Sequence, residues 1–200
     1  LDPQKIVISA AGIDTEFIAG LPKVLRDQHR LIWASSPNRG LENLLPIFAS
    51  ARAYEPRLNL QVYGSWDTVD KLIALHPNDP LEIRKQQILD LPQDGVTWHG
   101  WANHQMLYEA FLGSNLWVYP TTYPECGSVT AKEAQALGAI PVVHPFWSLK
   151  DDVHHGFLVG GNPEDLEIQA HYRNIILNLV EDQRHCDHIS TDMMAQARIV

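Results

Sequence analysis

Two glutamates separated by seven residues are the pair in this chain best suited to bind a ligand. Glu125 ends a loop with two prolines, and Glu133 lies within a predicted helix. About six residues of helix rise roughly 9 Å, so the two carboxylates would flank a nucleotide-sized molecule. Where the helix starts, the unpaired N–H groups of Gly127, Ser128 and Val129 favour an anion such as phosphate. This arrangement suits a sugar attached to a nucleotide diphosphate, although two solvated surface carboxylates are the alternative.

The loop over residues 35–40 is a second candidate phosphate site. It follows the second predicted strand and ends in Arg39 and Gly40, where a helix over 41–54 is expected. A guanidinium can bind two phosphate oxygens at once, while the start of the helix supplies further N–H donors. Ser36, in the same loop, is a candidate for another contact. The alternative is that Arg39 is a solvated residue on the first helical turn.

The segment Trp98, His99, Gly100 and Trp101 ends a predicted strand and is rich in aromatic side chains. An indole ring buries a large area and stacks well, so a tryptophan beside a base is physically reasonable. It is equally consistent with the sequence that Trp98 lies in the core and Trp101 at a domain interface. Asn103 is expected to be the N-cap of the next helix, because its side chain can accept from an unpaired N–H group.

The histidines do not form a convincing metal site. His185, Cys186 and His188 are close in sequence, but a tetrahedral zinc site needs a second pair of ligands at a defined spacing. No Asp-x-Asp sequence is present that would hold a metal ion on a sugar nucleotide. We therefore expect no metal and no cofactor. Cys126 lacks an identifiable partner base and is interpreted as lining the pocket.

The stretch from Tyr119 to Val143 resembles the Glu-(seven residues)-Glu motif of retaining glycosyltransferases with the GT-B fold, the large glycosyltransferase family four and its relatives. The positions that match the family pattern are Glu125, Gly127, Glu133, Ala134, Ala136, Gly138, Pro141, Val142 and Val143. Cys126 departs from it, because the family usually has a bulky residue there. The resemblance implies that Glu125 binds hydroxyls of the donor sugar and Glu133 binds those of the ribose.

The two other candidate segments resemble the family as well. Arg39 and Gly40 occupy the place of its phosphate-binding loop, but Ser35 and Ser36 stand where the family often has a second basic residue. The turn over 98–101 is similar to the family's hydrophobic-x-Gly turn, whose backbone groups bind the nucleobase. The departure at the two serines implies less positive charge around the diphosphate than is usual in the family.

The resemblance covers nearly the whole chain. Residues 5–18 look like the entry to the C-terminal half of a GT-B enzyme. This implies a single donor-binding domain over 1–200, with the N-terminal acceptor domain absent from this sequence and acting as its partner in cis. Such a domain would bind the nucleotide-sugar donor but transfer poorly alone.

Composition narrows the class of protein. The 200 residues are 45% hydrophobic and 20% charged, which is ordinary for a globular domain. No apolar run approaches the roughly 18 residues of a membrane span, and the first residues are not a signal peptide. A formal net charge of −9 argues against a nucleic-acid partner. Two cysteines fit a reducing compartment. We expect a cytoplasmic protein that is not transmembrane, with peripheral attachment at the inner membrane as an alternative for the full-length protein.

Short apolar runs alternate with helical patterns, which predicts an α/β class: a Rossmann-like layered domain with a mostly parallel sheet flanked by helices. Strands are expected over residues 5–9, 30–34, 58–64, 95–100, 115–120, 139–143 and, at one edge, 156–161. Helices are expected over 41–54 and 103–112, after Gly127 and from Asn162 onward, with two short helices between Trp66 and Asp90.

Three classes of function, and a glycoside hydrolase as a variant enzyme, fit these patterns to different degrees. The donor domain of a retaining glycosyltransferase uses all the motif residues, with Arg39 stabilising the leaving diphosphate and Glu125 orienting the sugar. A Rossmann-type oxidoreductase would need Gly-x-Gly-x-x-Gly after the first strand, and residues 10–13 lack that spacing. A glycoside hydrolase needs no phosphate loop. A non-catalytic nucleotide-sugar binding module is the remaining alternative. The base (UDP or GDP), the sugar and the acceptor (glycan, lipid or protein) stay open.

Overall fold

The computed structural model describes residues 12–76 and 79–197, and these contain a six-stranded parallel sheet. The strands are β1 (Asp27–Ala34), β2 (Asn59–Tyr63), β3 (Val96–Gly100), β4 (Ser114–Tyr119), β5 (Ile140–Val143) and β6 (Phe157–Leu158). Their order in the sheet is β3-β2-β1-β4-β5-β6. The predicted α/β class with a mostly parallel sheet is confirmed. The strand expected over 5–9 lies outside the described residues.

The order of strands reverses between β1 and β4. The chain moves outward from β1 through β2 to β3 and then returns to pair β4 with the other side of β1. Ile32 of β1 is in register with Trp117 of β4. In open α/β sheets, ligands bind outside the carboxyl ends of the strands at such a reversal. The loops that follow β1 and β4 meet at this place, and both carry predicted site residues.

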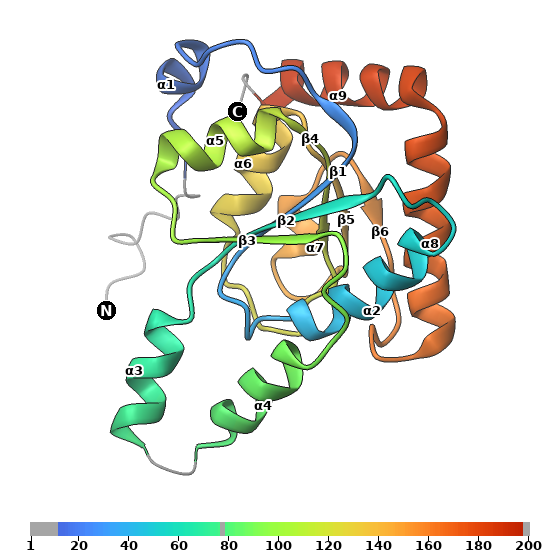
Figure 1. The fold of residues 1–200 in the computed structure, drawn as a ribbon. Coiled ribbons are helices and arrows are strands. Elements are labelled where there is room, and N and C mark those ends of the chain that lie inside the picture. Colours follow the sequence, from blue (N-terminus) through green and yellow to red (C-terminus); the bar gives the residue numbers. More distant parts are fainter. Residues whose placement is uncertain (1–11, 77–78, 198–200) are drawn as a thin grey trace, which may run out of the picture.

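Helices cover both faces of the sheet. They are α1 (Thr15–Ala19), α2 (Leu41–Arg52), α3 (Asp67–Leu75), α4 (Pro80–Leu89), α5 (His104–Leu112), α6 (Val129–Leu137), α7 (Leu149–Asp152), α8 (Leu166–Glu181) and α9 (Gln183–Ala197). Helix α2 packs against α8, whereas α6 packs against α5 and α9, and Figure 1 shows the two groups on opposite sides of the sheet. Helices α3 and α4 project away from the sheet as a hairpin (Figure 1). Among the residues that the structure describes, no helix combines the length and apolar character needed to cross a membrane.

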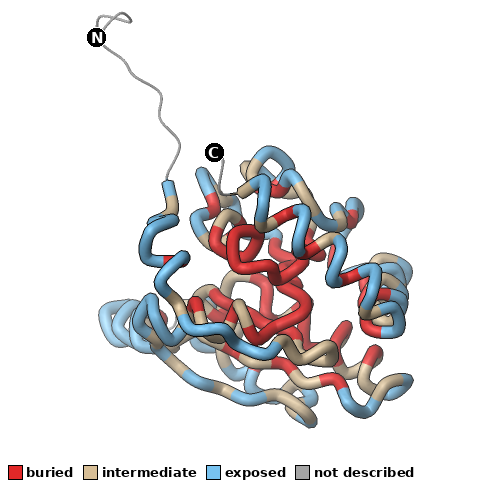
Figure 2. Tube along the Cα trace, turned by 90° about the horizontal axis from the view of Figure 1, so that it is seen from above, coloured by how far each residue is buried: buried red, intermediate tan, exposed pale blue. Residues whose placement is uncertain are grey.

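The central strands form the core. Every residue of β4 is buried, and Trp33 and Trp117 are among the largest side chains with no exposed surface. Buried residues gather in the middle of the molecule, whereas the outer helices are mostly exposed (Figure 2). A parallel strand covered on both faces reads as a nearly continuous apolar run, which is why the sequence located β1 and β4 correctly.

Several predicted elements are shorter in the structure, among them one helix and the edge strand. Helix α2 ends at Arg52 and not at residue 54, because Pro56 disfavours helical backbone at the residue before it. The edge strand expected over 156–161 is reduced to the two residues of β6. Gly156 and Gly161 have φ angles of +136° and +97°, so the chain turns at both ends of this short segment.

Helix α6, which carries Glu133, is held at its C-terminal end. Gly138 adopts the left-handed φ of +83° that commonly ends a helix. The side chain of Arg26, which directly precedes β1, donates from Nη2 to the carbonyl of Leu137 at 3.2 Å. A cation at this end compensates the helix dipole and satisfies a carbonyl that has no partner within the helix.

Candidate functional site

The loops that follow β1 and β4 are bonded to each other at the carboxyl edge of the sheet. The Thr121 hydroxyl donates to the carbonyl of Arg39 at 2.5 Å, and the Asn43 amide donates to the carbonyl of Pro120 at 2.9 Å. Gly40 lies between the two loops with a φ of +115°, and a Cβ atom there would lie 2.8 Å from Cα of Thr121. Only glycine fits both this φ and this contact. The predicted Arg39–Gly40 segment is therefore fixed against the loop that carries Glu125.

Glu125 is partly buried and held by a tyrosine. The Tyr119 hydroxyl donates to Oε1 of Glu125 at 2.9 Å, and Oγ of Ser35 lies 3.2 Å from the same hydroxyl. Burial raises the pKa of Tyr119, so this hydroxyl remains a proton donor across the physiological range. The Glu125 side chain keeps only 15% of its surface exposed. Tyr119 and Ser35 thus fix the direction of the carboxylate before any ligand arrives.

Arg39 and Glu125, which the sequence assigned to phosphate and sugar, lie beside each other. Nη1 of Arg39 is 3.6 Å from Oε1 of Glu125, and the guanidinium carbon is 4.3 Å from the ring centroid of Tyr123. The Arg39 side chain is 38% exposed, so this ion pair contributes little to stability. An anionic ligand at this edge would compete with Glu125 for the same cation.

Glu133 is buried, with 7% of its surface exposed. The Tyr108 hydroxyl, on α5, donates to its Oε1 at 2.8 Å. Burial and the neighbouring carboxylate both raise the pKa of Tyr108, so this hydroxyl also stays protonated. The alternative of two solvated surface carboxylates is therefore wrong. A buried acidic group with one tyrosine partner is a costly arrangement unless further partners complete it.

At the start of α6, fewer backbone N–H groups are open to an anion than the sequence predicted. Ser128 is the N-cap and its Oγ accepts from the N–H of Ala131. The Ser128 N–H itself donates to Oδ2 of Asp152 at 2.8 Å, so this amide is not open to phosphate. The amide of Gln135 in turn donates to the carbonyl of Asp152 at 2.9 Å and fixes that residue. Helix geometry leaves the N–H of Val129 without a partner inside the helix.

Asp152 could not have been found from the motif itself. It lies on α7, 24 residues after Ser128, and nothing local in the sequence marks it as an N-terminal partner of α6. Gly127 sits in the turn before the helix, where a Cβ atom would meet nothing within 4 Å. Anion binding by the N–H groups of Gly127 and Val129 therefore stays a prediction. For the N–H group of Ser128, which is bonded to Asp152, the prediction is wrong.

Trp98 contributes to packing. It is half-buried against the core, its Nε1 donates to Oε1 of Gln93 at 3.0 Å, and its ring centroid lies 6.3 Å from that of Trp66. These contacts support the interpretation of Trp98 as a packing residue. The predicted N-cap is confirmed as well, because the Asn103 side chain accepts from the N–H of Met106 at 2.9 Å.

His99 and Trp101 lie open at the end of β3. The His99 ring stacks on Tyr63 with centroids 4.3 Å apart and an angle of 4° between the planes, and its Nε2 lies 2.7 Å from Oε1 of Gln61. Desolvation, followed by the charge of Arg30, lowers the pKa of His99 and favours the neutral ring. Trp101 is 76% exposed. Both side chains have exposed surface, and their role at a nucleobase stays a prediction.

The histidine and cysteine cluster near the C-terminus is divided between core and surface. Cys186 is buried, and its thiol donates to the carbonyl of Leu179 at 2.9 Å. His188 instead points outward, with Nε2 3.4 Å from the Asp192 carboxylate. Within residues 12–76 and 79–197, no group of three or more His, Cys, Asp or Glu side chains is placed to hold a metal ion. Cys126, interpreted as lining the pocket, is exposed.

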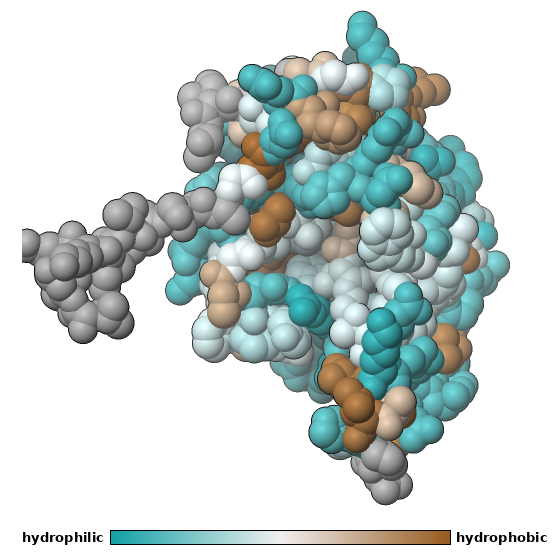
Figure 3. Space-filling view, turned by 90° about the vertical axis from the view of Figure 1, so that its left-hand side faces the viewer, coloured by the Kyte–Doolittle hydropathy of each residue, from teal (hydrophilic) through white to brown (hydrophobic). Residues whose placement is uncertain are grey.

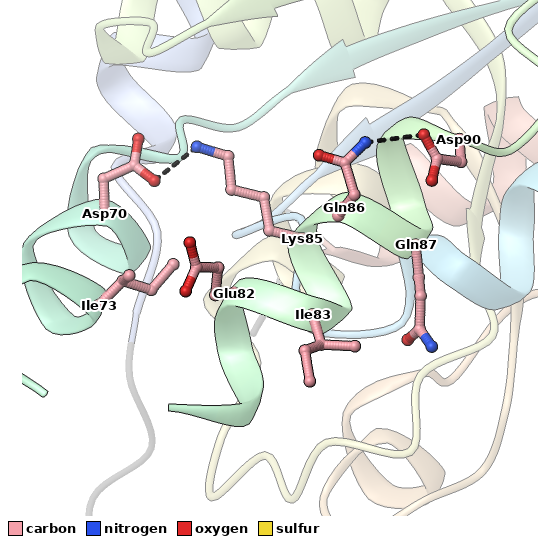
Figure 4. A pocket seen from close by; sticks show the side chains of 8 residues that line it. All are labelled: Asp70, Ile73, Glu82, Ile83, Lys85, Gln86, Gln87 and Asp90. Atoms are coloured by element: carbon pink, nitrogen blue, oxygen red, sulfur yellow. Dashed lines mark hydrogen bonds and ion pairs between the residues drawn. The ribbon is translucent and has the colours of Figure 1, made fainter. Parts of the chain in front are cut away.

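Two hollows lie away from the glutamates. One of about 600 Å³ lies between α3 and α4 (Figure 4), where Nζ of Lys85 pairs with Oδ1 of Asp70 at 2.5 Å. It is lined by Asp70, Ile73, Glu82, Ile83, Lys85, Gln86, Gln87 and Asp90. Figure 3 shows apolar surface near the tip of this hairpin, where Leu72, Leu75 and Ile83 are exposed. A second hollow of about 640 Å³ lies between α1 and α9. Neither includes Arg39, Glu125 or Glu133.

Solved structures share this fold at low sequence identity. A TarM mutant from S. aureus, in complex with fondaparinux, alpha-GlcNAc-glycerol and UDP, matches 99% of this chain with a TM-score of 0.61 and 18% identity. HepE from Anabaena, in complex with UDP-glucose, matches 92% with a TM-score of 0.61 and 21% identity. A glycosyltransferase from Rickettsia africae matches 99% with a TM-score of 0.59 and 18% identity.

This chain spans 36%, 45% and 56% of those three proteins, respectively. No protein-family model and no curated protein matches it. The likeness shows a fold, that of one domain of GT-B glycosyltransferases.

Proposed function

We propose that this chain is the donor-binding half of a retaining glycosyltransferase and that it binds a nucleotide-diphosphate sugar. One observation carries the proposal: Glu125 and Glu133 flank the start of α6 at the strand reversal, and each is oriented by a buried tyrosine hydroxyl. Holding two carboxylates in fixed directions costs desolvation free energy, which hydroxyl groups of a ligand would recover by completing their hydrogen bonds.

Each residue has a separate role in this proposal. Glu133 accepts hydrogen bonds from the ribose hydroxyls, and Glu125 accepts from hydroxyls of the donor sugar. Arg39 breaks its ion pair with Glu125 and binds the diphosphate. The N–H groups at the start of α2 and the N–H group of Val129 are further donors. His99, Gly100 and Trp101 lie at the end of β3, where the nucleobase would contact them.

The chemistry assigned to these residues is electrostatic. In a front-face transfer the bond from the anomeric carbon to the diphosphate oxygen breaks on the same face on which the acceptor oxygen bonds. The acceptor's proton passes to the leaving phosphate. Arg39 stabilises the negative charge that develops on that phosphate, and Glu125 orients the sugar. The whole reaction needs an acceptor site, for which we propose an N-terminal domain in cis.

Calorimetric titration of this chain with UDP and GDP tests donor binding. Glu133→Gln keeps the shape of the side chain and an acceptor for Tyr108 but removes the charge that strengthens hydrogen bonds from ribose. Such bonds are worth about 1.5–3 kcal/mol each, so affinity should fall about tenfold or more. Glu167→Gln, an exposed carboxylate on α8, is the matched control and should leave affinity unchanged. If Glu133→Gln left the affinities for UDP and GDP unchanged, that result would contradict the ribose role.

A non-catalytic nucleotide-sugar binding module is the second candidate, and it is favoured by two observations. Ser35 is engaged with Tyr119 and supplies no positive charge to the diphosphate, and Asp152 adds a negative charge at the start of α6. Transfer activity of the full-length protein separates the two candidates. Glu125→Gln should reduce transfer about a hundredfold if Glu125 orients the sugar in the transition state. A full-length protein that binds donor without transferring its sugar would favour the module.

A further inference from the structure

Trp147 has a backbone conformation that its side chain does not favour. Its φ is +50°, and it is the one residue other than glycine with a positive φ among those the structure describes. For a bulky side chain this left-handed region is disfavoured, because Cβ approaches the following carbonyl oxygen. Strained residues of this kind persist where the surroundings impose them, and they are concentrated at ligand-binding sites.

Packing does not account for a tryptophan at this position. The side chain is 57% exposed and is not among the residues packed against the core. Within the described part of the chain, its ring has no aromatic or cationic partner and its indole N–H has no hydrogen bond. Neither the backbone nor the core therefore explains why this residue is large and aromatic.

The turn that carries Trp147 is bonded to the candidate site on both sides. It follows β5, and at its start the His144 N–H donates to the carbonyl of Tyr119 at 3.2 Å. At its end the Ser148 N–H donates to the carbonyl of Glu125 at 3.2 Å. Trp147 thus directly precedes a residue that is hydrogen-bonded to the sugar-binding candidate. The turn and the Glu125 loop are held together as one part of the carboxyl edge.

We infer that Trp147 is a binding residue for the C–H face of a pyranose ring at the Glu125 edge. A pyranose presents hydroxyl groups around its rim and a patch of C–H groups on a face. Glu125 can accept from the hydroxyls, while an exposed indole can cover the C–H face and exclude water from it. This inference rests on the proposed function, and it adds the contact that would recognise the sugar, whether that sugar belongs to the donor or to the acceptor.

Trp101 is the matched control. It is also highly exposed, at 76%, but it follows β3, two strands away from β1, and its φ is not positive. A role at the nucleobase would make Trp101→Ala weaken UDP and UDP-sugars equally. A role at the pyranose would make Trp147→Ala weaken only the part of the affinity that the sugar adds to UDP.

The experiment titrates UDP, UDP-glucose and UDP-N-acetylglucosamine into the chain and its variants. Methyl α-glucoside titrated into the UDP-saturated protein distinguishes an acceptor sugar from a donor sugar. Trp147→Ala should reduce the sugar's contribution about fivefold to tenfold, on the scale of an aromatic contact, while UDP affinity stays constant. Trp147→Phe should retain part of it. A loss of sugar affinity in either the UDP-sugar titration or the methyl α-glucoside titration supports the inference. The titration that shows the loss identifies whether the pyranose belongs to the donor or to the acceptor.

Trp147→Gly separates a binding role from a structural one. Glycine accepts a φ of +50° without strain, so the unfolding midpoint should not fall, although sugar binding is lost. A clear drop in the midpoint, an equal loss for UDP and UDP-sugars, or unchanged sugar binding would each overturn the inference. Failure of the wild-type chain to bind either UDP or GDP would instead overturn the proposed function, and this inference with it. A chain that binds GDP alone is tested in the same way with GDP and GDP-mannose.

Discussion

The edge between β1 and β4 and the α3–α4 hairpin both meet solvent, but they differ in how their side chains are held. At the edge, Tyr119 and Thr121 donate to fixed partners in the neighbouring loop or side chain. In the hairpin, Leu75 and Ile83 are 72% and 65% exposed. The edge is therefore preorganised, whereas the described part of the hairpin leaves apolar side chains exposed.

This difference shows why the size of a hollow is a poor guide to function here. The hairpin contains a hollow of about 600 Å³ because two short helices touch at few residues. The two glutamates lie elsewhere. Burying them costs desolvation free energy, and each accepts a directed hydrogen bond from a tyrosine hydroxyl. Such contacts are retained where fixed direction matters, which is a stronger sign of a binding site than volume.

Among variants of the candidate site, the largest expected effect concerns the contact between the two loops. Gly40→Val should lower the free energy of unfolding by about 2–3 kcal/mol, because valine fits neither a φ of +115° nor the space beside Thr121. UDP binding should be lost along with the position of Arg39. Gly160→Ala, where a Cβ atom meets nothing within 4 Å, should change stability by less than about 0.5 kcal/mol. Urea unfolding measures both, and equal effects would show that the loops are not tightly joined.

Arg39→Ala should cost about 1.5–2 kcal/mol of UDP affinity, at least tenfold, because a charge-assisted contact to phosphate is lost. Affinity for uridine should not change, and the salt dependence of UDP binding should become weaker. Arg57→Ala is the control, since that exposed guanidinium pairs with Glu55 away from the edge. Equal losses for uridine and UDP would point to a disturbed loop and not to a phosphate contact.

Two tyrosines allow a matched test of the hydroxyl groups. Tyr108→Phe should destabilise the protein by about 1–2 kcal/mol and weaken UDP binding, because Glu133 loses its buried donor. The Tyr172 hydroxyl is buried and has no partner among the residues that the structure describes, so Tyr172→Phe should be neutral or stabilising. Thermal and urea unfolding give both values. A larger loss for Tyr172→Phe would contradict the assigned hydrogen bonding.

The smallest effect is expected in the hairpin. Leu75→Ser should change stability by less than about 0.5 kcal/mol and leave UDP affinity unchanged, because the side chain is 72% exposed. Leu116→Ala, in the fully buried β4, should cost about 2–5 kcal/mol. A marked effect of Leu75→Ser on UDP binding would mean that the hairpin takes part in the site.

The sequence predicted the strands that form the centre of the sheet because these are buried on both faces and read as apolar runs. It also singled out both glutamates and the arginine as candidate site residues, since glycine, proline and charge mark the ends of helices and loops. It overestimated the length of the edge strand, because only two residues of the expected 156–161 pair with β5 as β6. The strand order became known only from the structure, because periodicity carries no information about which strands pair.

The partners of the site residues were beyond sequence reasoning. Tyr108 and Glu133 come from different helices, and Asp152 reaches Ser128 from α7. Such contacts depend on how elements pack, and the local pattern around each residue is the same with or without them. The sequence does show a large aromatic residue, Trp147, directly before a serine. Its positive φ, however, cannot be predicted from the sequence.

The junction of Gly40 with Thr121 has a consequence for how this chain can vary. Glycine is required at position 40 because the backbone of position 121 occupies the space of a Cβ atom. Ser35 and Tyr119 join the same two loops differently, through their side-chain hydroxyls. Because a backbone atom blocks position 40, no substitution at position 121 makes room there, and position 40 should stay glycine among homologues. Positions 35 and 119, about eighty residues apart, meet through side chains and should instead covary as residues in spatial contact do.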